Sequence, residues 1–119
     1  MKKNKISKNW INKQKRDIYV RQSKLEGYRS RAVYKLQEIQ TKFKVINNGM
    51  SIVDLGAAPG SWSEFISRKF KNIKLVAIDL KELDKIENVT HIKGDFTDEI
   101  IQKKIEKNFD EKIDLVVSD

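Results

Sequence analysis

A short apolar run leads directly into a glycine-bracketed turn at residues 53–62, which read VDLGAAPGSW. The run predicts a buried strand, Gly56 and Gly60 permit a sharp turn, and a helix is expected from Trp62 to about residue 70. In parallel α/β proteins this unit presents backbone N–H groups to a nucleotide-like ligand. Its Gly-x-x-x-Gly spacing favours a ligand without a pyrophosphate, because dinucleotide sites use Gly-x-Gly-x-x-Gly. The same unit can also be purely structural.

Apolar runs and helical segments alternate along the rest of the chain. Strands are predicted at residues 51–55, 74–79, 89–93 and 113–118, with helices at about 62–70 and 98–107. Short strands separated by helices are typical of an α/β fold with a parallel sheet and right-handed crossovers. Ahead of the first strand we expect a helix at 10–24, a break at Gly27 and a second helix of about a dozen residues after Ser30. Residues 1–9 are expected to be disordered.

Several polar residues are candidate helix caps. Asp17, Ser30 and Asp98 each precede an apolar periodic segment, as N-cap residues do. Ser61 and Glu64 have the spacing of a capping box. The helix after Ser30 has an apolar stripe at helical spacing, formed by Ala32, Val33, Leu36, Ile39 and Phe43.

Acidic side chains follow the second and third predicted strands. Asp79 lies 23 residues after Gly56, where a carboxylate can accept hydrogen bonds from ribose hydroxyls. Asp95 can accept from an adenine amino group, with Phe96 beside the ring. Each acid alone has a structural alternative as a helix cap or turn residue. Their positions at successive strand ends together predict an adenosine-type site.

Two residues beside the turn have roles that the sequence leaves open. Asp54 lies within the first strand, where a buried carboxylate needs partners. For this residue a structural role in orienting the loop is favoured over contact with a cofactor's amino group. Trp62 is equally consistent with packing under a cofactor and with filling the core.

Lys35 and Asp119 form a candidate catalytic pair. Asp119 closes the fourth predicted strand, where the carboxyl edge of the sheet would bring it beside the cofactor. Lys35 projects from the edge of the apolar stripe and can reach the same area. A lysine–aspartate pair can hold a ribose hydroxyl, orient it and help to remove its proton. For Lys35 taken alone, a solvated surface lysine is the favoured interpretation.

Positive charge is concentrated towards the N-terminus. Residues 1–44 carry 14 Lys/Arg against 3 Asp/Glu, whereas residues 45–119 carry 11 against 14. A basic front and a slightly acidic back predict that one face binds a polyanion. By charge alone, a solvated basic tail is equally consistent with this distribution.

The composition argues against several classes of site. The chain has no cysteine and one histidine, His91, so disulfides are impossible and a cysteine- or histidine-based metal site is not expected. No apolar stretch reaches the roughly 18 residues of a membrane helix, and no apolar region of a secretory signal follows the lysine-rich N-terminus. We therefore expect a cytoplasmic protein with neither a membrane nor a metal partner.

Four segments carry a specific likeness to a known family: RSRAVYKL at 29–36, VDLGAAPGSW at 53–62, GDF at 94–96 and VSD at 117–119. In residue identity and order they resemble the FtsJ/RrmJ family of S-adenosylmethionine-dependent ribosomal RNA 2′-O-methyltransferases. The likeness extends from about Trp10 to the last residue. It implies a three-layer, Rossmann-like methyltransferase fold with a mostly parallel sheet, S-adenosyl-L-methionine as cofactor, and a uridine ribose of 23S ribosomal RNA in the large ribosomal subunit as substrate.

The resemblance also implies roles for single residues. Lys35 and Asp119 match the first lysine and the aspartate of a Lys-Asp-Lys-Glu catalytic tetrad. The candidate cofactor-binding residues are Gly56, Gly60, Trp62, Asp79, Asp95 and Asp119. Residues 1–28 would be a basic RNA-binding extension and residues 29–119 the N-terminal part of the methyltransferase domain. RNA phosphates are expected at Arg21, Lys24, Arg29 and Arg31.

The second lysine, the glutamate and the later strands of that family would lie beyond Asp119. We therefore expect the chain to hold the N-terminal half of the domain, and the complete protein to be a monomer. By itself the 119-residue chain is expected to be inactive and either weakly stable or prone to aggregation, because its fourth strand would be an exposed edge. Two alternatives remain: an inactive remnant that binds RNA and cofactor, and a nicotinamide-dependent oxidoreductase half-domain. The missing third glycine and the basic leader disfavour the latter.

Overall fold

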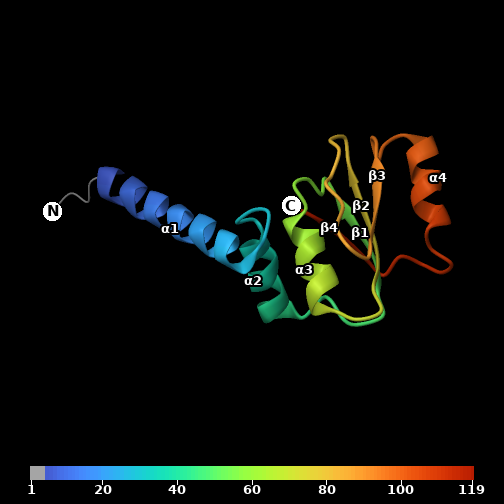
Figure 1. Ribbon diagram of the computed structural model, residues 1–119, viewed down its shortest axis with the longest axis horizontal. Helices are drawn as coiled ribbons and strands as arrows, with labels where there is room; N and C mark the ends of the chain where they lie inside the picture. The colour runs from blue at the N-terminus through green and yellow to red at the C-terminus, as the bar shows by residue number, and fades with distance from the viewer. Residues whose placement is uncertain (1–4) are drawn as a thin grey trace.

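The computed structural model describes residues 5–119 and contains four helices and four strands, all labelled in Figure 1. The helices are α1 (Lys5–Glu26), α2 (Val33–Phe43), α3 (Ser61–Lys69) and α4 (Glu99–Lys107). The strands are β1 (Ser51–Leu55), β2 (Lys74–Asp79), β3 (Val89–Lys93) and β4 (Leu115–Ser118). Below, α1 is termed the arm and residues 28–119 the body.

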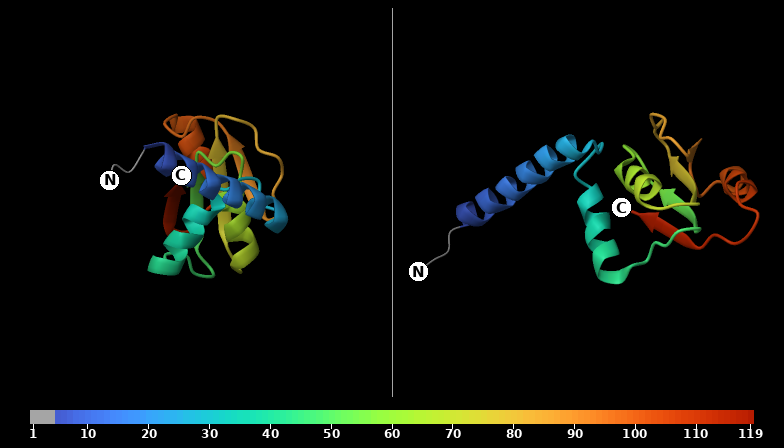
Figure 2. Two further views of the ribbon diagram at one scale, coloured as in Figure 1. Left: turned by 90° about the vertical axis from the view of Figure 1, so that its left-hand side faces the viewer. Right: turned by 60° about the horizontal axis from the view of Figure 1, so that its bottom comes forward.

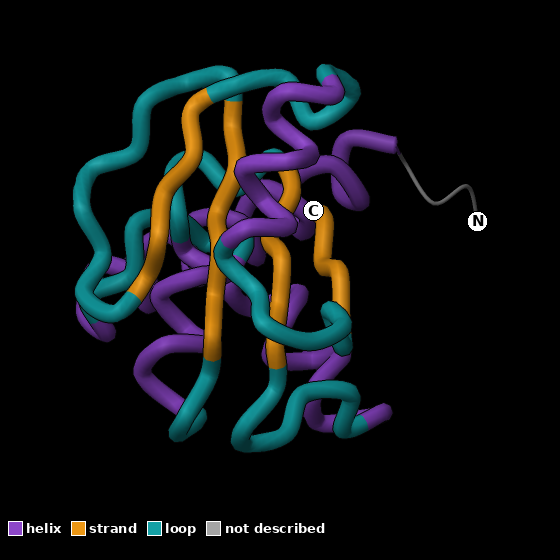
Figure 3. Tube along the Cα trace, turned by 90° about the vertical axis from the view of Figure 1, so that its right-hand side faces the viewer, coloured by secondary structure: helices purple, strands orange, loops and turns teal. Residues whose placement is uncertain are grey.

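The body is built on a parallel sheet with the strand order β3-β2-β1-β4 (Figure 3). In β1, Val53 pairs with Val76 of β2 on one side and with Val116 of β4 on the other. β3 runs parallel to β2 as well. All four strands therefore end at the same edge of the sheet, and the loops that follow them meet there. The predicted α/β fold with a parallel sheet is confirmed.

Helices cover both faces of the sheet and make three layers (Figures 1 and 2). On the face of α2 and α3, the core contains Val33, Leu36, Ile52, Trp62, Phe65, Ile66, Leu75 and Val117. On the face of α4, it contains Val53, Val76, Ile78, Ile101 and Ile105. Successive strand residues point to opposite faces, so a strand covered on both sides is apolar at almost every position.

The arm projects from the body as one continuous helix (Figure 2). The described molecule measures 60 × 29 × 25 Å, and the arm extends along the longest axis. Towards the body, Ser23 is buried and the Tyr19 ring stacks on Tyr34 of α2 with 5.4 Å between centroids. Other apolar side chains of the arm are exposed, among them Trp10 and Leu25. None of the helices within residues 5–119 is both long and apolar enough to cross a membrane.

Two predictions for the first 26 residues are wrong. Residues 5–9 belong to the arm instead of a disordered tail, while residues 1–4 lie outside the described residues. Asp17 lies inside the arm and caps no helix, because the helix runs unbroken to Glu26. The predicted break at Gly27 is confirmed, and this glycine has a φ of +77°.

The predicted caps of α4 and α2 have different outcomes. Asp98 accepts a hydrogen bond from the Ile100 N–H and caps α4, as predicted. Ser30 does not cap α2, which begins only at Val33. Its hydroxyl instead accepts from the Ala32 N–H in the turn before the helix.

The predicted capping box of α3 is wrong. Gly60 occupies the N-cap position, and Ser61 and Glu64 bind the segment between α1 and α2 instead of each other's backbone. Two further details differ from the predictions. Phe43 leaves the apolar stripe and is 70% exposed at the end of α2, and the fourth strand begins at Leu115 rather than at residue 113. Contacts with distant segments override the local pattern at α3.

Candidate functional site

The turn after β1 is anchored to the end of β2. Gly56 and Gly60 have φ values of +66° and +117°, which L side chains rarely adopt. The Ala57 N–H donates to a β2 carbonyl at 3.0 Å, and the Ala58 N–H donates to Asp79 Oδ2 at 2.9 Å. These bonds fix the turn at the carboxyl edge of the sheet, where the sequence predicts a ligand.

Asp79 and Asp95 both bind backbone at this edge. Asp79 also accepts from the Lys81 N–H at 2.8 Å, and its carbonyl accepts from the Gly94 N–H at 2.9 Å. Asp95 accepts from the N–H and the hydroxyl of Thr97, and these bonds lower the pKa of its carboxyl. A carboxylate oxygen has more than one lone pair, so both acids can still accept from a ligand. Asp79 thus joins the loops that follow β1, β2 and β3.

Asp54 is a buried acid beneath the turn, with 2% of its surface exposed. The Ser63 hydroxyl donates to its Oδ2 at 2.7 Å. Burial raises the pKa of Asp54 to about 6; the Ser63 bond opposes this, and the carboxylates of Asp119 and Asp79 raise it further. Three acidic groups therefore act on one small volume, which favours a positively charged ligand there.

Trp62 takes part both in the core and in the wall of the site. Its side chain is buried, and the indole N–H donates to the Ala32 carbonyl at 2.8 Å, which ties α3 to the start of α2. The ring also lines the surface hollow beside the turn. The two roles that the sequence left open are compatible.

Two adjoining hollows open at this edge of the sheet. The smaller one, of about 130 Å³, is lined by the turn after β1 together with Asp54 and Trp62. The larger one, of about 490 Å³, lies between α2 and the end of the arm. Ser30, Ala32 and Asp119 line both, so the hollows share a wall. Within residues 5–119 no three His, Asp or Glu side chains are grouped to hold a metal ion.

Lys35 and Asp119 meet where the hollows adjoin. The Lys35 Nζ donates to Asp119 Oδ1 at 2.7 Å, across 84 residues of sequence. Their side chains are 64% and 34% exposed, so a solute can reach both. Val33 and Leu36 of α2 belong to the same buried core cluster as Val117 of β4, and this shared core brings the pair together. Of the predicted site residues, Gly56 and Trp62 line the same surface, whereas Gly60, Asp79 and Asp95 line neither hollow.

The four predicted RNA contacts divide into two groups. Arg21 and Lys24 are exposed on the arm, and Arg31 is exposed beside Lys35 on the wall of the larger hollow. The Arg29 guanidinium is instead engaged within the chain. Its Nη1 donates to the Pro59 carbonyl at 3.0 Å.

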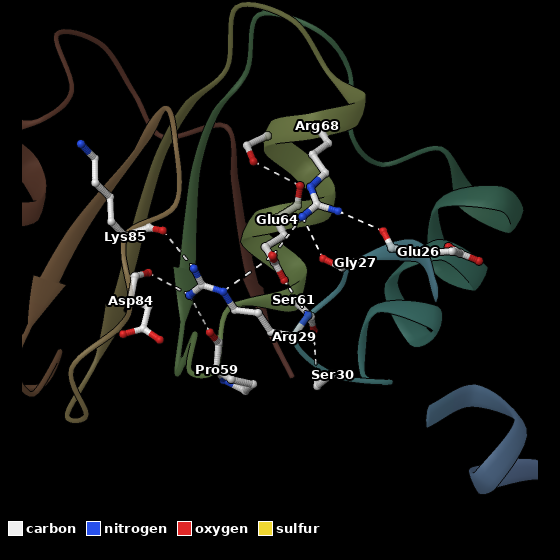
Figure 4. Close-up of polar contacts among 11 residues, drawn as sticks. Glu26, Gly27, Arg29, Ser30, Pro59, Ser61, Glu64, Arg68, Asp84 and Lys85 are labelled. Atoms are coloured by element: carbon white, nitrogen blue, oxygen red, sulfur yellow. Dashed lines mark hydrogen bonds and ion pairs between the residues drawn. The ribbon is translucent and has the colours of Figure 1, made fainter. Parts of the chain in front are cut away.

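Arg29 belongs to a cluster of polar contacts that we term the clasp (Figure 4). Besides Pro59, its guanidinium donates to the carbonyls of Asp84 at 2.8 Å and Lys85 at 3.0 Å. The Arg29 backbone N–H donates to Glu64 Oε1 at 2.8 Å, and its Nε lies 3.6 Å from Oε2. One side chain thus connects the segment after the arm with α3 and with the loops after β1 and β2.

Arg68 completes the clasp from α3. Its Nη2 donates to the Gly27 carbonyl at 2.9 Å and to Glu64 Oε2 at 3.1 Å. Its guanidinium lies 4.8 Å from the centre of the Tyr28 ring. Glu64 is buried and binds both arginines. Sequence reasoning missed the clasp; its one local signal is the four-residue spacing of Glu64 and Arg68 on a helix.

Comparison with known proteins gives consistent matches. The model of the family described as FtsJ-like methyltransferase matches residues 28–119. Over its whole length the chain is 64% identical to the ribosomal RNA large subunit methyltransferase E of Pelagibacter ubique (strain HTCC1062). It is also 47% identical, over 121 aligned residues, to the protein of that name from Pseudomonas fluorescens (strain Pf0-1). The chain spans 59% and 58% of the lengths of these two proteins.

A solved structure agrees with these matches. A crystal structure from Plasmodium falciparum, of a protein assigned as a ribosomal RNA methyltransferase, superimposes with a TM-score of 0.70 at 35% sequence identity. The match covers 77% of this chain and 56% of that one. The sheet and its strand-end loops are therefore arranged as in a methyltransferase fold.

Proposed function

This chain belongs to the FtsJ-like methyltransferase family, and from that premise we propose that the protein methylates a ribose 2′-hydroxyl of large-subunit ribosomal RNA with S-adenosyl-L-methionine. The names of the relatives support the class of RNA, and the resemblance implies a uridine of 23S ribosomal RNA as the target. The observation that carries the proposal is the accessible Lys35–Asp119 pair, in which Asp119 lines both hollows and Lys35 lines the larger one. The cytoplasm is the proposed compartment, because ribosomal subunits are available there.

The charge of the smaller hollow supports a cationic nucleoside. Asp54 and Asp119 line it and Asp79 holds its turn, so an anionic pyrophosphate would be repelled. S-adenosylmethionine carries a positive sulfonium and an ammonium group, which these acids attract. At Gly56 a Cβ would meet no atom within 4 Å, so the backbone is open to a ligand. The cofactor, when bound, supplies an electrophilic methyl group. Asp79 and Asp95 are the proposed partners of its ribose and adenine.

Lys35 and Asp119 are the proposed catalytic residues. The lysine ammonium can donate a hydrogen bond to the 2′-oxygen, and the aspartate can accept the hydroxyl hydrogen. Because the ion pair fixes the two groups 2.7 Å apart, they can hold one hydroxyl in a single orientation. Such alignment, together with assistance in removing the proton, lowers the barrier to attack by the oxygen.

RNA is proposed to dock on the arm and at the larger hollow. Arg21 and Lys24 would contact phosphates along the exposed side of α1, and Arg31 would do so beside the catalytic pair. An extruded target nucleotide could rest against Tyr19, a residue that is 44% exposed and lines the same hollow as Lys35. In this arrangement one RNA molecule contacts both the basic arm and the residues beside the catalytic pair.

The test combines cofactor binding with methyl transfer by the full-length protein. Calorimetry with S-adenosylhomocysteine measures binding, and transfer of labelled methyl groups to unmodified large subunits, followed by mapping of 2′-O-methyl positions, measures activity. The wild-type protein is expected to do both. Lys35→Ala is expected to reduce transfer by about 10²-fold or more, with little change in the Kd for S-adenosylhomocysteine.

The alternatives predict other results. RNA and S-adenosylhomocysteine binding without transfer would support an inactive binding protein. Tight binding of a nicotinamide dinucleotide with weak binding of S-adenosylhomocysteine would support an oxidoreductase. Undiminished transfer by Lys35→Ala would contradict the proposed role of the pair.

A further inference from the structure

We infer that Arg29 is a positioning residue of the cofactor site rather than a contact for RNA phosphate. Its side chain holds the turn after β1 from the side away from the ligand. The inference rests on the proposed function of that site. The Arg29 guanidinium points from the segment after the arm towards the loops after β1 and β2 (Figure 4).

The hydrogen-bond donors of Arg29 are nearly all engaged within the protein. A guanidinium has five N–H groups in a planar fork. Three of them donate to the carbonyls of Pro59, Asp84 and Lys85, and Nε faces the buried Glu64. The side chain is 23% exposed. A phosphate that used the fork would have to displace these partners, whereas exposed Arg31 has no such competition.

The atoms that Arg29 binds determine the shape of the cofactor turn. Proline has no N–H, so at Pro59 the carbonyl is the backbone group that can be held. At the adjacent Gly60, a Cβ would lie 3.1 Å from Arg29 Nη1 and 2.9 Å from Ile86 Cδ1. Arg29 and Ile86 therefore form a close wall behind the turn. The same guanidinium fixes Asp84 and Lys85, which immediately precede Ile86.

The clasp also places this support at the base of the arm. Glu64 accepts from the Arg29 N–H, and Arg68 binds the Gly27 carbonyl, so α3 holds both ends of the short segment that follows the arm. Loss of the Arg29 side chain is therefore expected to loosen the cofactor turn first, while the basic residues of the arm stay available to RNA.

The experiment compares two arginines that lie two positions apart, in the full-length protein. Arg29→Gln is expected to weaken S-adenosylhomocysteine binding about tenfold, the effect of losing roughly one charge-assisted hydrogen bond. The slope of log RNA affinity against log salt should stay unchanged. Arg31→Gln should reduce that slope by about 1 and leave the Kd for S-adenosylhomocysteine unchanged.

A conservative variant distinguishes the charge of the Arg29 side chain from its hydrogen-bonding geometry. Arg29→Lys keeps the charge, but its donors all lie on one nitrogen and cannot reproduce the planar fork that reaches the carbonyls of Pro59, Asp84 and Lys85. We expect it to bind S-adenosylhomocysteine as weakly as Arg29→Gln and to show faster amide hydrogen exchange at residues 56–61 and 84–88. It also decides the question if Arg29→Gln does not fold.

Two results would overturn the inference: full recovery of S-adenosylhomocysteine binding in Arg29→Lys, or a reduced salt slope in Arg29→Gln. If the wild-type protein binds no S-adenosylhomocysteine, the proposed function fails instead. Hydrogen exchange in Arg29→Lys then still reports whether Arg29 holds the turn, and unchanged exchange at residues 56–61 would reject the positioning role.

Discussion

The arm and the body place equally apolar residues in opposite environments. Leu36 of α2 is 1% exposed, whereas Leu25 near the end of the arm is 88% exposed. The body buries its apolar residues in cores on both faces of a sheet, so its sequence is explained by contacts within the chain. The arm leaves most of its surface uncovered and basic. Its sequence is better explained by a partner outside the chain, which we propose to be RNA.

The largest expected difference comes from one substitution made in both regions. Leu36→Ala should lower the free energy of unfolding by about 3 kcal/mol, because it leaves a cavity between α2, α3 and the sheet. Leu25→Ala should change it by less than about 0.5 kcal/mol. Urea unfolding of the full-length protein measures both. Similar losses would show that the arm packs against the body in solution.

A glycine pair sharpens the comparison within the body. Gly60 and Gly49 have φ values of +117° and +82°, so alanine strains the backbone at either position. Only at Gly60 would the new Cβ meet atoms closer than 3.4 Å, and at Gly49 it would meet nothing within 4 Å. We expect Gly60→Ala to cost about 2 kcal/mol and to abolish S-adenosylhomocysteine binding, and Gly49→Ala to cost about 1 kcal/mol. Thermal melting and calorimetry compare them, and equal losses of stability would argue against the close wall.

Removing positive charges from the arm and from the body should affect RNA binding differently. Arg21→Gln combined with Lys24→Gln should lower RNA affinity about tenfold and reduce the salt slope by about 2, with little change in stability. The matched control is Lys103→Gln with Lys104→Gln, two exposed cations of α4 on the far side of the sheet. Filter binding over a range of salt concentrations gives both slopes. An equal reduction by the control would mean that the charge effect is non-specific.

The smallest expected change in ligand affinity is a pH dependence that belongs to the body. The native pKa of Asp54, about 6, lies above its ordinary value of 3.8, so the native state holds more protons between about pH 4 and 6. The free energy of unfolding should therefore fall as the pH rises through this window. Affinity for the positively charged S-adenosylmethionine should rise several-fold from pH 5 to 7.5, because the ionised carboxylate attracts it.

Asp54→Asn should flatten both pH profiles, and calorimetry with denaturation curves at each pH would show this. Asp110→Asn, at an exposed loop position, is the control and should leave them unchanged. A pH-independent affinity in the wild-type protein would contradict the electrostatic account of the smaller hollow.

The sequence predicts the body better than the arm, because the body's elements have local signals. The strands at residues 74–79 and 89–93 have the predicted bounds, since short apolar runs between turns are well defined. The sequence also predicts the meeting of Lys35 with Asp119, because the fourth strand ends at the carboxyl edge of the sheet and Lys35 can reach that edge from the helix before the first strand. The arm lacks a clear apolar period and begins earlier than expected, at Lys5.

The clasp could not be predicted, for a different reason. Arg29 interacts with carbonyls up to 56 residues away, and backbone carbonyls have no sequence signature. Locally its neighbourhood looks like a basic patch, and Glu64 has the spacing of a capping box. Only the fold shows that the acid and the arginine face each other.

Because the arm is long, a small rotation at its base becomes a larger displacement of its far end. With 22 residues, α1 is about 33 Å long at 1.5 Å per residue. For a rigid rod of that length, a rotation of about 1° at the base displaces the tip by roughly 0.6 Å. The pivot is set by the Arg68 bond to Gly27 and by the Tyr19–Tyr34 stack. Trp10 lies nine residues, about 13 Å, beyond the Tyr19 contact, so a rotation of about 5° there would move it by roughly 1 Å, and the reach of the distal arm is adjusted at its root.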